Sequence, residues 1–234
     1  SSVILIPCLL NPVQTMEDRE GVIKYQLNHQ TTPINPAISI TELNAWRTIL
    51  FNLKLIGQIE GRYDGLGFGN ISQRIKSGSS DNNPFLITGS QTGAVETLSK
   101  QHYCTVLKAC PYQNQIDSEG ETKPSSESLT HAGIYQQDKS IQSVVHIHCP
   151  KIWNHTTQLG LPRTSAEIKY GTAEMANEVT RLLNTSELKT KKIFSMLGHR
   201  DGIVAFSDSI ESAAQIILSY YAKSLALDQT QGQS

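Results

Sequence analysis

The sequence predicts one α/β domain in which helices are layered on a sheet that contains antiparallel strand pairs. Stretches of helical periodicity alternate with short β-type runs along the whole chain, which is typical of this fold class. Several connections between the predicted strands are too short for a helical crossover, so those strands are expected to pair antiparallel. The 234 residues fit one large domain and show no internal repeat.

The first third of the chain is predicted to contain a connection, a helix and two strands. Two prolines and several Asn and Thr residues indicate a connection at 28–39. Apolar residues then recur at spacings of three and four, so Thr41 is the expected N-cap of a helix that ends near Gly57 or Gly61. The elements that follow are a glycine-rich loop at 65–70, a strand at 71–75, a turn at 77–83 and a strand at 85–88.

The rest of the chain continues this alternation. Strand residues at 103–116 are interrupted at Pro111, and 117–120 has the composition of a turn. A helix is expected to begin at 124–126. The remaining expected elements are strands at 143–148, 192–197 and 202–206 and helices at 173–183 and 209–227.

Composition and charge exclude several classes of protein. The 20 basic and 21 acidic side chains nearly cancel, so no nucleic-acid partner is expected. No apolar stretch approaches the roughly 20 residues that span a bilayer, and the first residues lack the basic region of a secretory signal. Four cysteines without a CxxC pair form neither a disulfide framework nor a zinc ribbon. These features predict a cytoplasmic protein with no membrane partner.

The sharpest chemical feature is His146-Ile147-His148 at the end of a predicted buried strand. Side chains two residues apart leave a strand on the same face, with their Cα atoms about 7 Å apart. Two imidazoles at that spacing can bind one cation, while Ile147 points to the opposite face, into the core. An isolated pair of this kind is also compatible with two hydrogen-bonded polar residues. Its place after Val144-Val145, at a strand end where open sheets keep their clefts, favours a metal site.

A third ligand must come from elsewhere in the chain. His199 follows a predicted strand and precedes a glycine turn, so its side chain can reach a neighbouring strand end. His155 is a weaker candidate, because the helix-like stretch that carries it could turn it toward solvent. Three histidines with an open position are typical of a catalytic zinc site, whereas structural zinc usually has four ligands.

Glu127 is the candidate proton carrier. It lies near a predicted helix start, where the helix dipole and free amides favour its ionised form, and beside a metal it could remove or return a proton. The same position is typical of a glutamate that only stabilises the helix. His131, one turn later, shares its face and is a candidate partner for Glu127.

Glycine-rich and hydroxyl-rich segments could bind an anion. The loops at 65–69 and 88–93 offer backbone amides but match neither the P-loop nor the dinucleotide-binding pattern. Ser125 and Ser126 add hydroxyl donors at a helix N-terminus. These segments modestly favour a phosphate or carboxylate pocket.

Six short motifs occur in order along the chain. They are Gly69-Asn70-Ile71-Ser72, Leu86-Ile87-Thr88-Gly89, Pro124-Ser125-Ser126-Glu127, Val144-Val145-His146-Ile147-His148, Tyr170-Gly171-Thr172 with Glu174, and Gly198-His199-Arg200-Asp201-Gly202. Taken together, these motifs resemble the class II aldolase/adducin family, whose L-fuculose-phosphate aldolase-type members are metal-dependent lyases. The similarity extends from about Thr41 to Leu227.

The resemblance implies a three-layer α/β/α domain with a predominantly antiparallel central sheet, assembled as a homotetramer. It implies an N-terminal extension at 1–40, a class II aldolase/adducin-like domain at 41–227 and a C-terminal tail at 228–234. It also assigns Glu127 as the acid/base and a divalent ion, expected to be zinc, to His146, His148 and His199. The residues that it places around the substrate are Asn70, Thr88, Gly89, Ser125 and Ser126.

Three departures from the family pattern leave questions open. Many members have His directly before Gly at the third-ligand motif, so Asp201, which precedes Gly202 here, is the alternative to His199. Imidazole suits the other two ligands better, which favours His199. Gly67 replaces a hydroxyl residue that helps hold phosphate, so the sequence leaves open whether the substrate is phosphorylated. The stretch from Leu161 to Tyr170 is shorter than the family segment that carries a tyrosine proton donor, so no tyrosine can be assigned that role and Tyr170 is only a nearby candidate.

The predicted function is that of a metal-dependent carbon–carbon lyase of the aldolase type, acting on a small sugar, sugar phosphate or keto acid through a metal-stabilised enediolate. The same site would serve an epimerase, a dehydratase or a decarboxylase, and manganese, cobalt or iron could replace zinc. A non-catalytic adducin-like scaffold is the rival from another class, and the retained Glu127 and histidines argue against it. Residues 1–15, which precede Met16, are expected to be an extension that the fold does not need.

Overall fold

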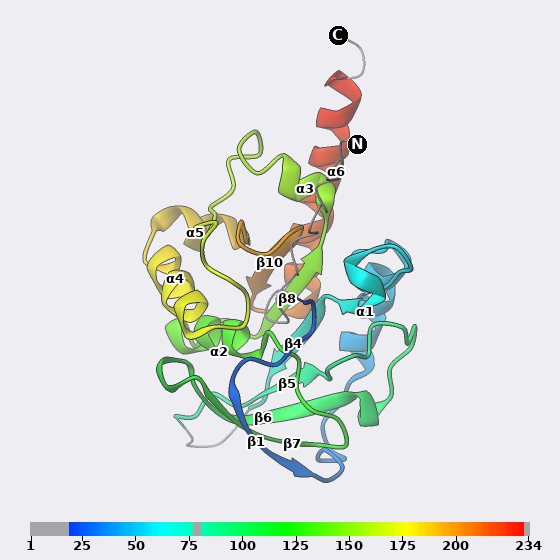
Figure 1. Ribbon diagram of the computed structural model, residues 1–234, viewed down its shortest axis with the longest axis vertical. Coiled ribbons are helices and arrows are strands. Elements are labelled where there is room, and N and C mark those ends of the chain that lie inside the picture. The colour runs from blue at the N-terminus through cyan, green and yellow to red at the C-terminus, as the bar shows by residue number, and fades with distance from the viewer. Residues whose placement is uncertain (1–18, 77–80, 232–234) are drawn as a thin grey trace, which may run out of the picture.

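A large sheet with helices on both faces forms the body of the protein in the computed structural model, which describes residues 19–76 and 81–231 (Figure 1). The predicted α/β class is confirmed. Across the sheet the strands follow the order β1 (Gln26–Thr31), β7 (Gln115–Gly120), β6 (Tyr103–Cys110), β5 (Phe85–Thr88), β4 (Asn70–Arg74), β8 (Ser143–His148), β10 (Gly202–Ser207) and β9 (Ile193–Ser195). A separate pair is made by β2 (Gly57–Gln58) and β3 (Gly67–Phe68).

The sheet is mixed. The neighbouring strands from β7 to β9 pair antiparallel, as predicted, but β1 pairs parallel with β7. β1 lies in the segment that the sequence assigns to an extension, and it overlaps the predicted connection at 28–39. Backbone hydrogen bonds to a preformed strand edge hold such a segment extended whatever its own weak propensity.

Two hydrophobic clusters lie on opposite faces of the sheet and are covered by different helices. α2 (Ser128–Gln137) and α4 (Ala173–Leu183) pack on one face, and α1 (Thr41–Asn52) and α6 (Ile210–Gln231) pack on the other. In Figure 1, α2 and α4 lie together on one side and α1 on the opposite side. The shorter helical segments are α3 (Pro150–Asn154), α5 (Ser186–Lys191) and the 3-10 turns η2 (Tyr63–Gly65), η3 (Lys100–His102) and η4 (Pro111–Gln113).

The central strand β8 separates the two clusters. Val144 belongs to the cluster under α2 and α4, whereas Val145 and Ile147 belong to the cluster under α1 and α6. Because side chains alternate along a strand, His146 and His148 share the face of Val144. The prediction that Ile147 points into the core on the opposite face is confirmed.

Two predicted helix starts differ from the observed ones, the first of them by a single residue. Thr41 is the first residue of α1 rather than its N-cap, and Ile40 takes that position without a capping side chain from the described residues. This helix ends at Asn52, earlier than predicted. α2 begins at Ser128, which puts Glu127 at its N-cap. Tertiary packing sets such ends more than local composition does.

The predicted turn at 117–120 is also wrong, because these residues belong to β7. The chain turns earlier, at η4, where Asn114 adopts a left-handed conformation with φ 53°. β7 is paired on both sides, to β6 and to β1, and this pairing keeps a segment of turn-like composition extended.

Residues 1–15 lie outside the described part of the chain, as do 77–80 of the turn predicted at 77–83. The domain boundaries at 1–40, 41–227 and 228–234 stay predictions. Within the described ranges, none of the helices has both the length and the apolar character needed to cross a membrane.

Candidate functional site

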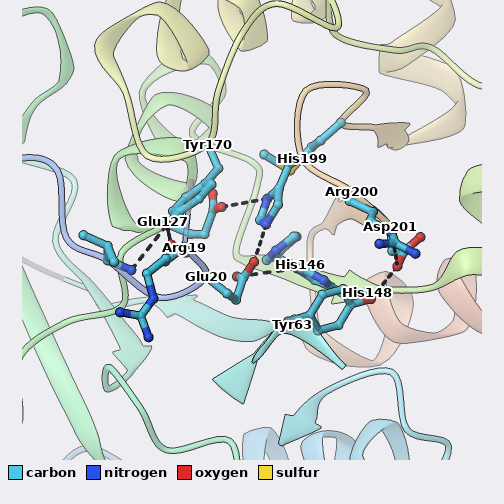
Figure 2. A network of polar contacts seen from close by, with 12 residues as sticks. Arg19, Glu20, Tyr63, Glu127, His146, His148, Tyr170, His199, Arg200 and Asp201 are labelled. Carbon is cyan, nitrogen blue, oxygen red and sulfur yellow. Dashed lines mark hydrogen bonds and ion pairs between the residues drawn. The ribbon is translucent and has the colours of Figure 1, made fainter. Parts of the chain in front are cut away.

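Three histidines from distant parts of the chain lie together (Figure 2). His146 and His148 project from β8, and His199 projects from the turn between β9 and β10. One ring nitrogen from each lies within 4.8 Å of the other two, and all three side chains are buried. The structure therefore brings together the three residues that the sequence proposes as metal ligands.

Strand pairing explains how His199 reaches the other two. β10 pairs antiparallel with β8, with Gly202 opposite His148. The turn before Gly202 is tight: the N–H of His199 donates to the Met196 carbonyl at 3.1 Å, and the His199 carbonyl accepts from the N–H of Gly202 at 2.9 Å. This turn brings the His199 ring to 4.7 Å from the His148 ring, measured between centroids.

Asp201, the alternative third ligand, is engaged elsewhere. Its Oδ2 accepts a hydrogen bond from the Tyr63 hydroxyl at 2.6 Å. The Tyr63 ring in turn packs edge-on against His148, with centroids 4.6 Å apart. Burial, and next the bond to Asp201, raise the pKa of Tyr63, so its hydroxyl stays protonated and donates. The sequence contains no signal for Tyr63, which begins the 3-10 turn η2.

Two carboxylates flank His199. Oε1 of Glu127 lies 3.1 Å from Nδ1 of His199, and Oε2 of Glu20 lies 2.8 Å from its Nε2. The other oxygen of Glu20 lies 3.7 Å from Nε2 of His148. Glu127 is fully buried and the Glu20 side chain is 11% exposed. Sequence reasoning missed Glu20, because it belongs to the segment assigned to an extension and to no recognisable motif.

The charges in this cluster are coupled. Burial alone would lower the pKa of His199, but the two carboxylates raise it to about 10, so the ring is positively charged. Burial would raise the pKa of Glu127, but the hydrogen bond from His199 and the neighbouring imidazoles lower it to about 2. The carboxylate is thus ionised, as predicted, through His199 and a hydrogen bond from Thr130 at 3.0 Å rather than through the helix amides. Burial lowers the pKa of His146 and His148, so both rings are neutral.

The donor set fits a divalent cation. Nδ1 of His146 donates to the Ile203 carbonyl at 3.2 Å. Its Nε2 is therefore unprotonated and has a free lone pair. That Nε2 and both ring nitrogens of His148 are buried and have no hydrogen-bond partner among the described residues. Buried polar atoms without a partner are rare, and a histidine whose second nitrogen donates to a carbonyl is typical of metal ligands.

A second buried network positions Asn70 beside the cluster. Asn70 lies directly opposite His146 in the pairing of β4 with β8. Nε2 of His131 donates to Oδ1 of Asn70 at 2.6 Å, and its Nδ1 accepts from the Ser72 hydroxyl at 2.7 Å. Burial lowers the pKa of His131 to about 3, so the ring is neutral. The prediction that His131 pairs with Glu127 is wrong, because both of its ring nitrogens are engaged by Asn70 and Ser72.

Four of the five residues predicted to surround the substrate line one small cavity of about 20 Å³. These four are Asn70, Gly89, Ser125 and Ser126. Thr88 lies outside that lining, and its hydroxyl accepts from the Ile71 N–H at 3.2 Å. Glu20 and Gly21 line the same cavity. Such a volume holds about one water molecule, which is too little for a phosphate group.

A larger cavity of about 710 Å³ opens beside His199, a size typical of small-molecule sites. Its lining includes Glu20, Tyr63, Lys169, Tyr170, His199 and Arg200. The Tyr170 ring stacks on His199 with centroids 4.6 Å apart. Its hydroxyl donates to the Arg19 carbonyl and accepts from the Val22 N–H at 3.3 Å, so the N-terminal segment engages it.

His155, the weaker candidate for the third ligand, lies apart from the cluster and is buried. Its Nε2 is 2.8 Å from Oδ1 of Asp228 in α6.

A comparison with models of known protein families identifies the family of this chain. The family model described as the Class II Aldolase and Adducin N-terminal domain matches residues 60–222, which is most of the chain. The protein therefore belongs to this family, as its motifs predict. A comparison with curated proteins gives no match.

Solved structures share the fold at low sequence identity. An L-fuculose 1-phosphate aldolase is 20% identical with a TM-score of 0.60, over 86% of this chain and 91% of that one. A sugar-phosphate aldolase from Thermotoga maritima is 15% identical with a TM-score of 0.62, over 83% and 95%. The L-fuculose-1-phosphate aldolase from Thermus thermophilus is 18% identical with a TM-score of 0.59, over 82% and 93%. At these identities the similarity establishes the fold alone.

Proposed function

We propose that the protein is a metal-dependent carbon–carbon lyase of the aldolase type that acts on a small sugar, sugar phosphate or keto acid. The observation that carries this proposal is the cluster of buried histidines, with unpartnered ring nitrogens, next to the ionised Glu127. His146, His148 and His199 would hold a divalent ion, expected to be zinc. The ion would stabilise the negative charge that develops on substrate oxygens beside the breaking bond.

Glu127 is the group proposed to move the proton. Thr130 donates to one of its oxygens and His199 faces the other, so the carboxylate is held in one orientation at the cluster. A general base must be unprotonated and must lie within reach of the proton that it removes. Asn70, oriented through His131, would donate its amide N–H to the substrate.

The larger cavity is the proposed substrate site. Lys169 and Arg200 line it together with the acidic Glu20 and Asp64, so the lining offers polar groups of both charges to a small polar substrate. Four of the residues predicted to surround the substrate, Asn70, Gly89, Ser125 and Ser126, line the cavity of about 20 Å³, whose size supports an unphosphorylated substrate while Glu20 and Gly21 remain in place. A homotetramer and a cytoplasmic location are further expectations of this proposal.

Metal analysis tests the proposed centre. Protein purified without chelator is expected to contain close to one divalent ion per chain, and His146→Ala is expected to lose it. His155→Ala removes a buried histidine outside the cluster and should keep the ion. A folded wild-type protein that takes up no divalent ion would overturn the proposal and favour the adducin-like scaffold.

An NMR screen of sugars, sugar phosphates and keto acids tests the reaction. Two smaller carbonyl products that form only with the metal-loaded protein would support the lyase. An inverted stereocentre, loss of water or release of carbon dioxide would instead identify an epimerase, a dehydratase or a decarboxylase that uses the same residues.

A further inference from the structure

We propose that Glu20 is a fourth protein ligand of the metal ion, delivered to the three histidines by the N-terminal segment 19–25 (Figure 2). This inference rests on the proposed metal centre. It adds a residue that lies outside the region matched by the family model, 60–222, and that belongs to none of the six motifs.

The distances fit ligation. Metal–ligand bonds of about 2.1 Å at the tetrahedral angle place neighbouring donor atoms about 3.4 Å apart. The two oxygens of Glu20 lie 2.8 Å from Nε2 of His199 and 3.7 Å from Nε2 of His148, on either side of that value. The two distances belong to different oxygens, so the carboxylate spans the nitrogens of the two histidines. Glu20 therefore already faces the nitrogens that an ion would join.

The charge balance points the same way. A carboxylate that is only 11% exposed requires a cation or strong hydrogen-bond donors around it. Oε2 of Glu20 lies 2.8 Å from Nε2 of His199 and Oε1 of Glu127 lies 3.1 Å from its Nδ1, so two carboxylates flank this one imidazole. A divalent ion held by the histidines would supply positive charge beside both carboxylates.

The segment that carries Glu20 is fixed at several points. The buried Tyr25 hydroxyl donates to the Ser125 carbonyl at 2.8 Å. Nζ of Lys24 lies 3.9 Å from the centroid of the Tyr170 ring, which itself stacks on His199. Gly21 has φ +73°, a left-handed turn directly after Glu20. These contacts hold the carboxylate in place, and a preorganised ligand loses less entropy when it binds.

Ligation by Glu20 closes the site at rest. Three histidines and one carboxylate complete a four-coordinate set, whereas catalytic zinc keeps one position for water or substrate. Glu20 lines both the larger cavity and the small one, so its carboxylate lies where a substrate would approach the ion. Substrate would have to displace Glu20 or expand the coordination number.

Metal titration of the full chain tests the proposal. Zn²⁺ affinity is measured by competition with a chromophoric chelator, and the visible spectrum is recorded for the Co²⁺-loaded protein. Glu20→Gln is expected to weaken Zn²⁺ binding at least about 10-fold, the lower end of what is lost even when an outer partner of a ligand is removed. Its Co²⁺ spectrum should change, because one oxygen donor is replaced. Glu20→His, which offers a nitrogen donor, should recover affinity.

Asp64→Asn is the matched control. Asp64 is exposed and lines the same larger cavity, so this variant removes one negative charge near the site without removing a donor. Wild-type affinity and spectrum are expected for it.

Three results would count against Glu20 as a ligand. Glu20→Gln that matches the wild type in affinity and spectrum would overturn ligation and leave the metal centre intact. Weaker binding with an unchanged Co²⁺ spectrum would assign Glu20 a through-space electrostatic effect and would also overturn ligation. A wild-type chain that binds no metal would instead reject the proposed function, and this inference with it.

Discussion

His131 makes a definite contribution to the pH dependence of stability. In the folded protein burial lowers its pKa to about 3, whereas the unfolded chain has the ordinary value of 6.5. Below pH 6.5 His131 is protonated in the unfolded chain but stays neutral in the folded protein, so acid favours unfolding. pH 5 lies about 1.5 units below the pKa of the unfolded chain, and each unit lowers the free energy of unfolding by about 1.4 kcal/mol. The protein should therefore be about 2 kcal/mol less stable at pH 5 than at pH 8.

His131→Gln removes this titration and keeps an amide that can hydrogen-bond. At pH 8 the variant is expected to be less stable than the wild type by about 1–3 kcal/mol, because the bonds to Asn70 and Ser72 are disturbed. At pH 5 that deficit should shrink by about 2 kcal/mol. Urea unfolding followed by far-UV circular dichroism, with chelator present, measures both values.

Ser72→Ala is the control for His131→Gln. It breaks one bond of the same network and leaves the imidazole buried, so its stability should change with pH in parallel with that of the wild type. If the curves of His131→Gln and the wild type are parallel instead, the folded protein accepts the proton on His131. The neutral, buried network would then be refuted.

Three further substitutions have expected outcomes. Glu127→Gln should keep the fold and lower turnover of the metal-loaded protein at least about 100-fold, measured by NMR of the products, because the general base is lost. Arg47→Leu leaves three backbone carbonyls in 92–96 without the buried guanidinium that donates to them at 2.7–3.2 Å. It should lower the free energy of unfolding by at least about 2 kcal/mol in urea. Gly93→Ala places a Cβ 2.4 Å from the Gly57 carbonyl oxygen, a backbone clash that should cost about 1–3 kcal/mol in the same assay.

Each of these three predictions has a result that would contradict it. Full turnover by Glu127→Gln would assign proton transfer to another group. Arg47→Leu with wild-type stability would mean that water replaces the guanidinium at the three carbonyls. An unchanged unfolding curve for Gly93→Ala would show that the loop can move away from Gly57.

Much of the fold was predictable because it depends on local patterns. The strands at 85–88 and 143–148 and the helix at 173–183 have the predicted bounds. Each combines a clear period with clear breakers at its ends. β1 and β7 were not predictable, because their own composition favours a connection and a turn. They become strands only through pairing with each other and with β6.

The sequence by itself determined that His146 and His148 leave one face of a buried strand, since alternation along a strand is a local property. It also determined family membership, because six motifs occur in order. The tertiary structure decided which third histidine faces them, which charge holds Glu127 ionised, and that Glu20 reaches the cluster. These contacts join residues up to 179 positions apart in the chain, and no periodicity or spacing encodes such separations. They exist because β8 pairs with β10 on one side and with β4 on the other, and because Tyr170 and Ser125 hold the N-terminal segment across the strand end.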